Sequence, residues 1–492
     1  MHKIVKPTFL LFTVLFVFNA GAQHLKPGFD NSEFIELLKI GARTSTDSSY
    51  YNSVPAPEHY KMIYQSAPIG LDNLWQLWID EDSVAVISVR GTTTTPVSFL
   101  LNFYAAMVSA KGQLNLEKNF KFDYNLSNDP NAAVHVGFLI GTAYLSRDIL
   151  PKIDSIYKNG GVKEFIIAGH SQGGAITYLL TSYLESMKKS GILPADIRFK
   201  TCASAAPKPG NLFYAYDFES VTRGGWAYNA VNTADWVPEV PFSIQTTNDF
   251  NDVNPFNNAK ALIKKQKFPA NLALRHVYNR LSKPAKRAQK NYEKFLGKMI
   301  SKYIKKFLPD FVPPTYFSSN NYVRTGSTIV LKADSDYYKK YPQDRNKVWM
   351  NHFPGPYLFL AEKLNEPTMT GNRMTDSKLA GSWELTYISG IRIAFEGLYP
   401  DRKPWISIDA DSSKLNGNTS CNIFSGKFKS TGNKINFTGP LAMTMMACPG
   451  EGESVFVKTL EKITAYSIAD DGVLSFLLND VVLMRFKKSK FH

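Results

Sequence analysis

The stretch EFIIAGHSQGGAITYLL, residues 164–180, changes character at a serine that stands between glycines. Residues 165–168 are a short apolar run of the kind that forms a buried strand. From Ala175 to Lys189, apolar side chains recur at the spacing of one helix face. We therefore expect a strand, a tight turn and a helix, with Ser171 in the turn.

Ser171 is the centre of a G-x-S-x-G pattern that runs from Gly169 to Gly173. A serine hydroxyl is a poor nucleophile unless a base removes its proton. In a turn of this kind the serine points away from the sheet, and the glycines remove Cβ atoms that would clash. The start of the helix favours negative charge on the attacked oxygen. The alternative is a glycine-rich turn with an incidental serine, but the flanking strand and helix favour a nucleophile.

The acid and the base of such a site are expected after the serine, with the acid first. The histidines that follow are His276, His352 and His492. His276 lies in a strongly basic segment and His492 is the last residue, whereas His352 stands between two apolar runs on an expected loop. His352 is therefore the preferred base, although a lone histidine often has only a structural role.

Asp235 is the preferred acid. It follows the run AYNAVNTA, and a carboxylate at a strand end can hold an imidazole in the required tautomer. Its alternative role is to form a turn before Pro238. Asp217, Asp249 and Asp252 are expected in polar loops with no strand before them.

A developing oxyanion needs hydrogen-bond donors. We expect one donor to be the backbone N–H of Gln172, the residue after the nucleophile. The other is expected from the loop that follows the strand SVAVISVRG, where Thr92 offers both a backbone N–H and a hydroxyl.

Strands and helices alternate from Phe29 to about Leu364, which predicts an α/β fold with a mostly parallel sheet flanked by helices. Residues 365–378 are polar and turn-rich, and we interpret them as a linker. Beyond them, short strands separated by turn signals predict a small β-rich domain, with one helical stretch near Glu453–Lys462. A chain of 492 residues is long enough for two domains.

Residues 1–22 combine two early lysines, an apolar core from Phe9 to Phe18 and an A-x-A pattern that ends at Ala22. This pattern predicts a signal peptide, cleavage near Ala22 and export to the periplasm, the cell envelope or the medium. The alternative is a buried N-terminal helix.

The cysteines are Cys202, Cys421 and Cys448. An exported protein can form disulfides, and Cys421 and Cys448 lie in one region where they can pair. Cys202 lies in an apolar strand-like run and is expected to remain a free thiol. No metal or nucleotide motif is evident, so no cofactor is expected.

The net charge of +15 is concentrated in residues 260–306, which hold fifteen Lys and Arg and one acid, Glu293. Within this segment an apolar helical stripe runs from Tyr292 to Leu308, and Pro309 is expected to end the helix. Lysines occupy the other faces: Lys290, Lys294, Lys298, Lys302 and Lys305. Such a helix can lie on an anionic membrane surface; the alternative is a helix packed on its own domain with solvated lysines. An exported protein is not expected to use it on nucleic acid.

Six motifs occur in an order that resembles the class 3 lipase family. They are VRGT at 89–92, VHVGF at 134–138, GHSQGG at 169–174, PKPGN at 207–211, VNTADWVPEVP at 231–241 and NHFPGPY at 351–357. The resemblance covers about residues 50–364 and implies an α/β-hydrolase fold of the fungal lipase type. It implies the same roles for Ser171, Asp235 and His352, with Thr92 and Gln172 at the oxyanion hole. His135 matches a family position that has no catalytic role.

The resemblance also implies that the segment after Thr92 is a lid. The apolar segment 93–107 is suited to covering a fatty-acyl groove, and the lid residues are Thr93, Phe99, Leu100, Leu101 and Phe103. The chain departs from the family between Asp235 and His352, where the separation is longer than expected. The excess coincides with a basic helical insertion at about 257–310.

The C-terminal segments LAGSWELTYISG, LNGNTSCNIFSGKF and GPLAMTMMACPGEGE resemble the META (HslJ-like) domain. Cys421 and Cys448 stand at matching positions. The resemblance implies a small, β-rich, envelope-associated fold, and it implies no chemistry.

These features predict an exported serine hydrolase that cleaves carboxylic ester bonds of lipids, triacylglycerol or phospholipid, through an acyl-enzyme. One alternative is a soluble esterase or acyltransferase that acts on non-lipid esters. Another is a non-catalytic envelope-binding protein. The expected order is a signal peptide (1–22), a lipase-like domain (23–364), a linker (365–378) and a META-like domain (379–490).

Overall fold

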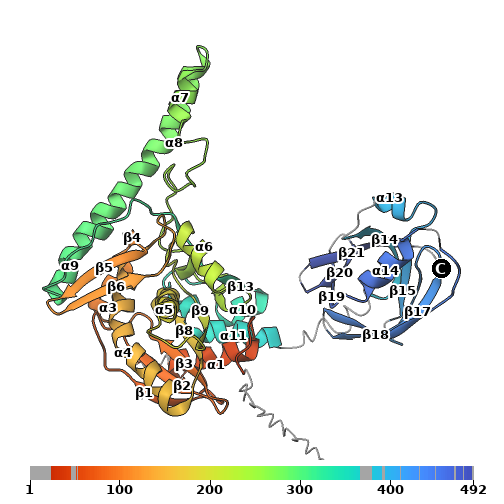
Figure 1. The fold of residues 1–492 in the computed structure, drawn as a ribbon, viewed down its shortest axis with the longest axis horizontal. Helices are drawn as coiled ribbons and strands as arrows, with labels where there is room; N and C mark the ends of the chain where they lie inside the picture. Colours follow the sequence, from red (N-terminus) through yellow and green to blue (C-terminus); the bar gives the residue numbers. More distant parts are fainter. Residues whose placement is uncertain are drawn as a thin grey trace, which may run out of the picture. The chain divides into compact units, whose positions relative to one another are not determined.

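The computed structural model describes residues 24–45, 51–52, 54–365, 379–389, 394–409, 412–431, 433–448, 450–469, 472–479 and 481–489. The expected signal peptide and residues 366–378 of the expected linker lie outside the described residues. The chain divides into two compact units, Met1–Glu362 and Lys363–His492 (Figure 1). Among the described residues, no helix combines the length and apolarity needed to cross a bilayer.

A seven-stranded sheet forms the centre of the first unit (Figure 1). Its order is β1-β2-β3-β8-β9-β11-β13. Every neighbouring pair from β3 onward is parallel, and the antiparallel β1 and β2 extend one edge. The strands are β1 (Lys61–Gln65), β2 (Trp75–Ile79), β3 (Val84–Val89), β8 (Glu164–His170), β9 (Arg198–Ser204), β11 (Ala227–Asn232) and β13 (Ser327–Leu331). The mostly parallel sheet predicted from the sequence is confirmed.

Helices cover both faces of this sheet, because its strands carry apolar side chains on both sides. In β8, Phe165 and Ile167 belong to one buried cluster, whereas Ile166 and Ala168 belong to the other. The first face is covered by α4 (Val136–Gly160), α5 (Gln172–Lys189) and α6 (Leu212–Val221). The second is covered by α1 (Asn31–Ala42), α10 (Ser335–Lys340) and α11 (Pro354–Asn365).

Two smaller sheets and several short helices complete the body of this unit. One sheet has the order β12-β10-β7-β4 and the other is the hairpin β5-β6. Their strands are β4 (Met107–Ser109), β5 (Lys111–Glu117), β6 (Phe120–Asn125), β7 (Ala133–His135), β10 (Gly210–Asn211) and β12 (Tyr322–Val323). The short helices are α3 (Pro96–Phe103) and the 3₁₀ turns Val237–Glu239 and Met350–His352.

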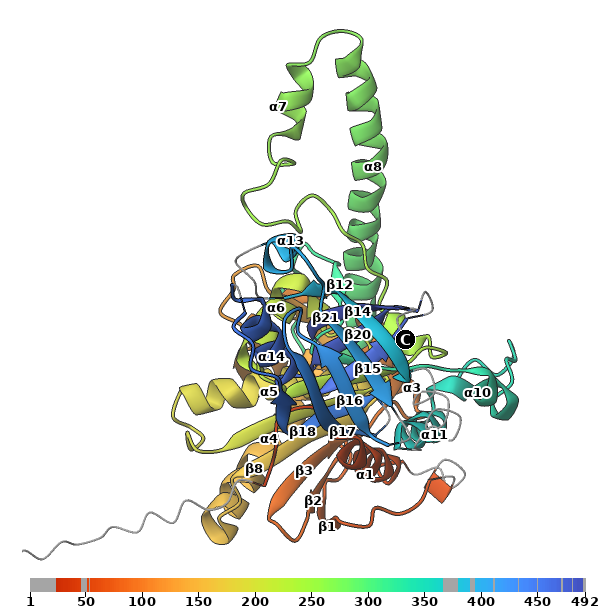
Figure 2. The same cartoon turned by 90° about the vertical axis from the view of Figure 1, so that its right-hand side faces the viewer.

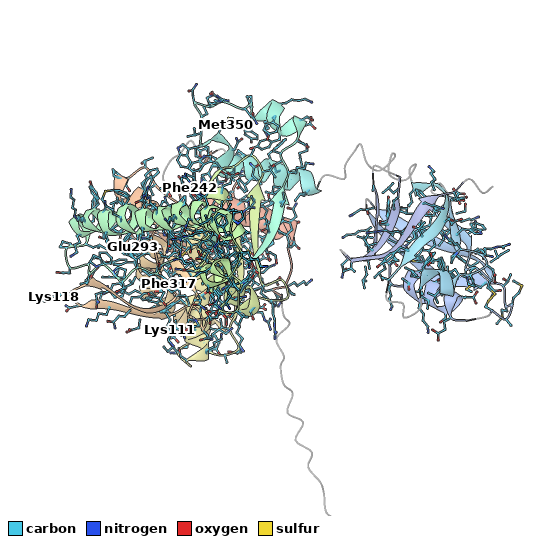
Figure 3. All side chains as sticks on the ribbon, turned by 90° about the horizontal axis from the view of Figure 1, so that it is seen from above. Lys111, Lys118, Phe242, Glu293, Phe317 and Met350 are labelled. Carbon is cyan, nitrogen blue, oxygen red and sulfur yellow. A yellow bond between two sulfur atoms is a disulfide. The ribbon has the colours of Figure 1, made fainter. Side chains whose placement is uncertain are left out.

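The basic insertion forms one long helical rod and a shorter helix beside it. The rod consists of α8 (Ala270–Tyr292), a π-helical segment (Glu293–Met299) and α9 (Ile300–Phe307), and α7 (Ala259–Lys264) precedes it. Figures 1 and 2 show α7 and most of α8 extending away from the body of the unit. Figure 3 shows the rod from above, with Glu293 labelled on it.

The single apolar stripe expected from Tyr292 to Leu308 is divided in the structure. Tyr292, Ile300, Ile304 and Leu308 are buried against the unit. Phe295, Met299, Tyr303 and Phe307 are exposed on another side of the rod. Helical spacing groups apolar residues on a face, but it does not tell which part of that face the domain covers.

The second unit contains a closed barrel of eight antiparallel strands, in which β14 pairs with β21 to close the ring. The strands are β14 (Gly381–Ile388), β15 (Trp405–Asp409), β16 (Lys414–Asn418), β17 (Ile423–Thr431), β18 (Lys434–Met443), β19 (Ala465–Ile468), β20 (Leu474–Leu478) and β21 (Val481–Lys488). The described part of this unit also contains the helices α13 (Phe395–Leu398) and α14 (Gly452–Leu460). The predicted β-rich C-terminal domain is confirmed, and Trp383, Phe424 and Phe476 lie in its core.

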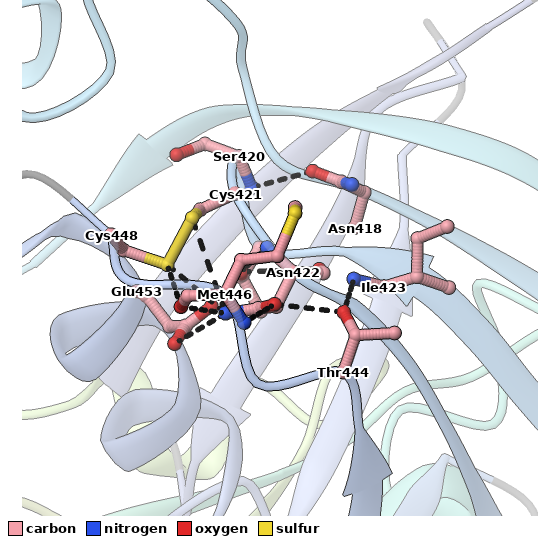
Figure 4. Close-up of a disulfide and its surroundings, with 10 residues drawn as sticks. Asn418, Ser420, Cys421, Asn422, Ile423, Thr444, Met446, Cys448 and Glu453 are labelled. Carbon is pink, nitrogen blue, oxygen red and sulfur yellow. Dashed lines mark hydrogen bonds between the residues drawn. A yellow bond between two sulfur atoms is a disulfide. The ribbon is translucent and has the colours of Figure 1, made fainter.

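A disulfide joins Cys421 to Cys448 in this barrel (Figure 4). The buried side chain of Asn422 holds the surrounding loops together. Its Oδ1 accepts from the Thr444 hydroxyl at 2.8 Å, and its Nδ2 donates to a carboxylate oxygen of Glu453 at 3.2 Å. Cys202, by contrast, is a buried free thiol in β9.

Candidate active site

Ser171 lies in the connection between β8 and α5, where the backbone takes an unusual conformation. Its φ and ψ are 60° and −131°, a region that side chains other than glycine rarely occupy. Both flanking glycines are required by close packing. A Cβ on Gly169 would lie 2.5 Å from the backbone of Gly173, and a Cβ on Gly173 would lie 2.2 Å from the carbonyl oxygen of Val89.

Three side chains from separate parts of the chain meet at this turn. His352 Nε2 lies 2.7 Å from Ser171 Oγ, and His352 Nδ1 lies 2.9 Å from Asp235 Oδ2. Asp235 follows β11, and His352 ends the 3₁₀ turn before α11. The Asp235 side chain is 0% exposed and that of His352 is 8% exposed. The arrangement can draw the proton of the Ser171 hydroxyl toward an imidazole held by a carboxylate.

The carboxylate of Asp235 has two further donors that hold its orientation. Its Oδ1 accepts from the backbone N–H of Val237 at 3.0 Å, and its Oδ2 accepts from the hydroxyl of Tyr357 at 2.8 Å. Tyr357 is fully buried on α11, one helical turn after the loop that carries His352. No sequence pattern pointed to a role for Tyr357, although it stands in the quoted motif NHFPGPY.

A second histidine supports the loop of His352. His170 Nε2 lies 2.7 Å from the backbone carbonyl oxygen of His352, and its Nδ1 lies 2.9 Å from Ser204 Oγ. Burial, and secondarily the neighbouring imidazole, lower the pKa of His170 to about 3. The neutral ring therefore donates from Nε2 to the carbonyl and accepts from Ser204 at Nδ1. The position of His170 beside Ser171 in the chain gave no sign of this positioning role.

Thr92 and Gln172, the residues expected at an oxyanion hole, are linked through Asn102. The amide of Asn102 donates to the Thr92 hydroxyl oxygen at 2.9 Å, and the Gln172 side chain donates to Asn102 Oδ1 at 3.1 Å. Because the Thr92 hydroxyl accepts one hydrogen bond here, its own hydrogen can point elsewhere. Gln172 is the first residue of α5, where a backbone N–H has no partner within the helix.

The loop after Thr92 is held by Asp72, a residue that no sequence motif singled out. Its carboxylate accepts from the hydroxyls of Thr93 at 2.5 Å and Thr95 at 2.7 Å, and from the guanidinium of Arg90 at 2.8 Å. Burial raises the pKa of Asp72, but these hydrogen bonds and the charge of Arg90 outweigh it, so the pKa lies below its usual value. The cluster fixes both ends of the loop around Gly91.

The segment expected to be a lid forms α3 and the turn before it. Leu101 is buried in the core, Phe99 and Leu100 are half-buried, and Phe103 is exposed. Gln172 donates to the carbonyl oxygen of Ser98 at 3.0 Å, which ties α3 to the serine turn. In this structure α3 therefore lies directly beside the site.

The remaining candidates lie elsewhere. His135 is buried at the start of α4, where its Nδ1 accepts from the N–H of Phe138 at 3.3 Å. Burial lowers the pKa of His135 to about 3, as expected of a structural residue. Asp217 lies on α6 rather than in the expected loop. Asp249 accepts from Thr246 and Ser319 instead of a histidine.

One group of metal-ligand side chains lies close together among the described residues. It consists of Cys421, Cys448 and Glu453. The two sulfur atoms are joined in the disulfide, so they are not available as thiolate ligands in this state.

Two family models match the chain. Residues 86–245 match the class 3 lipase model, and residues 377–490 match the META domain model. These matches confirm the two resemblances that were inferred from the sequence motifs. Each covers part of the chain, and together they leave the basic insertion unmatched.

Among curated proteins, secreted mono- and diacylglycerol lipase 1 of Fusarium solani is 28% identical in sequence to this chain over 171 aligned residues. The alignment covers 33% of this chain and 48% of that protein, so the chain spans about half the length of this relative. Similar solved structures include a Rhizomucor miehei lipase–propeptide complex, with a TM-score of 0.33 and 18% identity over 44% of this chain and 66% of that chain. The Lip2 lipase from Yarrowia lipolytica gives a TM-score of 0.34 and 19% identity over 44% and 76%.

Proposed function

We propose that this protein is a serine hydrolase that cleaves carboxylic ester bonds of lipids. The observation that carries the proposal is the contact of His352 Nε2 with Ser171 Oγ at 2.7 Å, with Asp235 at 2.9 Å behind the imidazole. The class 3 lipase match over residues 86–245 and the similarity to a diacylglycerol lipase support lipid esters as substrates.

In the proposed reaction, His352 Nε2 takes the proton of Ser171 as Oγ attacks the ester carbonyl carbon. Asp235 keeps the proton of His352 on Nδ1 and stabilises the imidazolium that forms. The tetrahedral oxyanion accepts hydrogen bonds from the backbone N–H of Gln172 and from Thr92. The imidazolium then protonates the leaving alcohol, which leaves an ester between the acyl group and Ser171.

Water completes the cycle. His352 removes a proton from water, which attacks the acyl-enzyme and releases the fatty acid, and the proton returns to Ser171. The strained backbone of Ser171 holds Oγ toward the imidazole. The proposed roles of Tyr357 and His170 are to position Asp235 and His352, since each donates a hydrogen bond to one of them.

We also propose that the protein is exported, on the basis of the pattern in residues 1–22 and of a relative that is named as secreted.

The proposed lid is α3 with the turn before it, where Phe99 and Leu100 are half-buried and Phe103 is exposed. Opening would require loss of the hydrogen bonds from Gln172 to Ser98 and Asn102.

The test compares the mature protein with Ser171→Ala and Asp235→Asn on p-nitrophenyl esters of graded acyl length and on emulsified triacylglycerol and phospholipid. We expect Ser171→Ala to be inactive and Asp235→Asn to lose on the order of 10⁴-fold in kcat, because an asparagine favours the wrong imidazole tautomer. A matched control is Ser155→Ala on an exposed turn of α4. Hydrolysis that survives Ser171→Ala would refute the assigned nucleophile.

The same assay separates the remaining alternatives. A soluble esterase or acyltransferase would prefer short soluble esters and would show no rise in rate above the critical micelle concentration. A non-catalytic envelope-binding protein would hydrolyse none of these substrates.

A further inference from the structure

The residues 259–290, which we call the cationic arm, comprise α7, the connection after it and most of α8. The arm contains ten Lys and Arg and no Asp or Glu. Figures 1 and 2 show from two directions that the arm extends away from the body of its unit. A charge of one sign on a projecting element attracts a surface of the opposite sign.

The cationic and apolar residues of α8 lie on opposite sides of the helix. At about 3.6 residues per turn, Leu274, Val277 and Leu281 fall on one side. Arg280, Lys283, Lys286 and Arg287 fall on the remaining arc of the same helix. A helix with an apolar side and a strongly basic side is suited to lie in the interface between lipid headgroups and acyl chains.

The apolar side of the arm is not covered by the protein. Leu274 is 46% exposed, Val277 53% and Leu281 72%. Phe268, near the turn between the two helices, is exposed as well. A helix that only packs on its own domain would bury these side chains, as α9 buries Ile304. Solvated lysines alone therefore do not account for the arm.

The exposed apolar surface continues along the rod toward the candidate active site. Phe295, Met299, Tyr303 and Phe307 follow at intervals of four residues and are exposed. The other side of α9 packs against α3, and Leu101 and Ile304 share one buried cluster. The rod therefore connects the arm to the helix that borders Ser171.

We propose that the cationic arm binds the surface of membranes that contain anionic lipids. Leu274, Val277 and Leu281 enter the interface, and the basic residues contact the anionic headgroups. Docking in this way brings the rod, and α3 beside it, close to a lipid surface. The inference adds a partner to the proposed function, and binding itself requires no hydrolysis.

The experiment measures co-sedimentation of the mature full chain, carrying Ser171→Ala, with vesicles of phosphatidylcholine alone and of phosphatidylcholine with 30% phosphatidylglycerol. Because this background contains no nucleophile at Ser171, the result does not depend on catalysis. One variant removes four charges: Arg280→Gln, Lys283→Gln, Lys286→Gln and Arg287→Gln. Its matched control removes four exposed charges elsewhere in the unit: Lys26→Gln, Lys61→Gln, Lys158→Gln and Lys189→Gln.

We expect the parent to bind the anionic vesicles at least tenfold more tightly than the zwitterionic ones. The arm variant should lose at least tenfold of that binding, because each cation near an anionic surface contributes about a fivefold factor. The control should bind anionic vesicles within about threefold of the parent. A second variant, Leu274→Ser/Val277→Ser/Leu281→Ser, should also lose at least tenfold through the lost apolar contact. Thermal melting followed by circular dichroism verifies that each variant is folded.

Three results would overturn the proposal. The first is equal binding of the parent to both kinds of vesicle. The second is an equal loss of binding in the arm variant and in its control. The third is a concentration-dependent dimer in sedimentation experiments that the leucine and valine changes abolish while vesicle binding stays undetectable. That outcome would assign the arm to a second copy of this chain.

Discussion

The backbone of Ser171 leads to a prediction about stability that is independent of any substrate. Its φ of 60° and ψ of −131° place it in a region that costs of order 1–3 kcal/mol for a residue with a Cβ. Ser171→Ala and Ser171→Gly both remove the hydroxyl that contacts His352. They differ in that glycine also relieves the backbone strain.

The magnitude follows from two opposing terms. Glycine recovers the strain of about 1–3 kcal/mol, but it costs about 0.5–1 kcal/mol more backbone entropy on folding than alanine. We therefore expect Ser171→Gly to be about 1 kcal/mol more stable than Ser171→Ala. At most positions the glycine variant is the less stable of the two, so the expected order at Ser171 is the opposite of the usual one.

The control is Ser155, an exposed position within α4. There Ser155→Gly should be about 1 kcal/mol less stable than Ser155→Ala, because the site is an ordinary helical one. Urea unfolding followed by tryptophan fluorescence compares the four variants, and the barrel contributes the same background to each. If Ser171→Gly proves no more stable than Ser171→Ala, the serine turn is not strained and the reasoning is refuted.

Three further predictions follow, two from contacts within the first unit and one from the disulfide within the second. Asn102→Leu removes the donor to the Thr92 hydroxyl and should lower kcat of ester hydrolysis about 10- to 100-fold with little change in KM, since one oxyanion donor loses its orientation; an unchanged kcat would contradict this. The folded-state pKa values of His135 and His170 are lowered to about 3. Below about pH 6.5 these two imidazoles bind protons in the unfolded chain but stay neutral in the folded protein. Their contribution to the free energy of unfolding is therefore fully present above about pH 6.5 and is lost as the pH falls toward 3. Urea unfolding between pH 7.5 and 5 should therefore show a shallower loss of stability in His135→Asn than in the parent, and identical slopes would count against it. Finally, the Cys421–Cys448 disulfide spans 27 residues, so replacing both cysteines with serine should lower the stability of the barrel by about 3–4 kcal/mol and leave ester hydrolysis unchanged; a matching loss of hydrolysis would show that the units are coupled.

The proposed chemistry and the proposed membrane contact rest on different parts of the chain. The reaction depends on the carboxyl-terminal ends of β8 and β11 and on the loop before α11. The membrane contact depends on an insertion that the class 3 lipase match does not cover. If this protein hydrolyses esters but does not bind anionic vesicles, only the membrane proposal fails. If it binds anionic vesicles but hydrolyses no ester, only the proposed reaction fails.

Ser171, Asp235 and His352 could be selected from the sequence because each carries a local signal. A strand, a glycine pair and a helix surround Ser171, and the order of the chain restricts the acid and the base to residues after it. The β-rich character of the second unit was also readable, because alternating apolar residues and turn signals are properties of neighbouring residues. These signals require no knowledge of what the elements pack against.

The supporting contacts were decided by the tertiary structure. Asp72 meets Thr93 across a loop, His170 holds the carbonyl of His352, and Tyr357 reaches Asp235, each between residues that are distant in the chain. The sequence also did not predict that the apolar stripe has a buried side, which includes Ile304, and an exposed side. The amino-acid pattern indicates how apolar a helix face is. Its burial depends on which other elements pack against that face, and those contacts exist only in the folded chain.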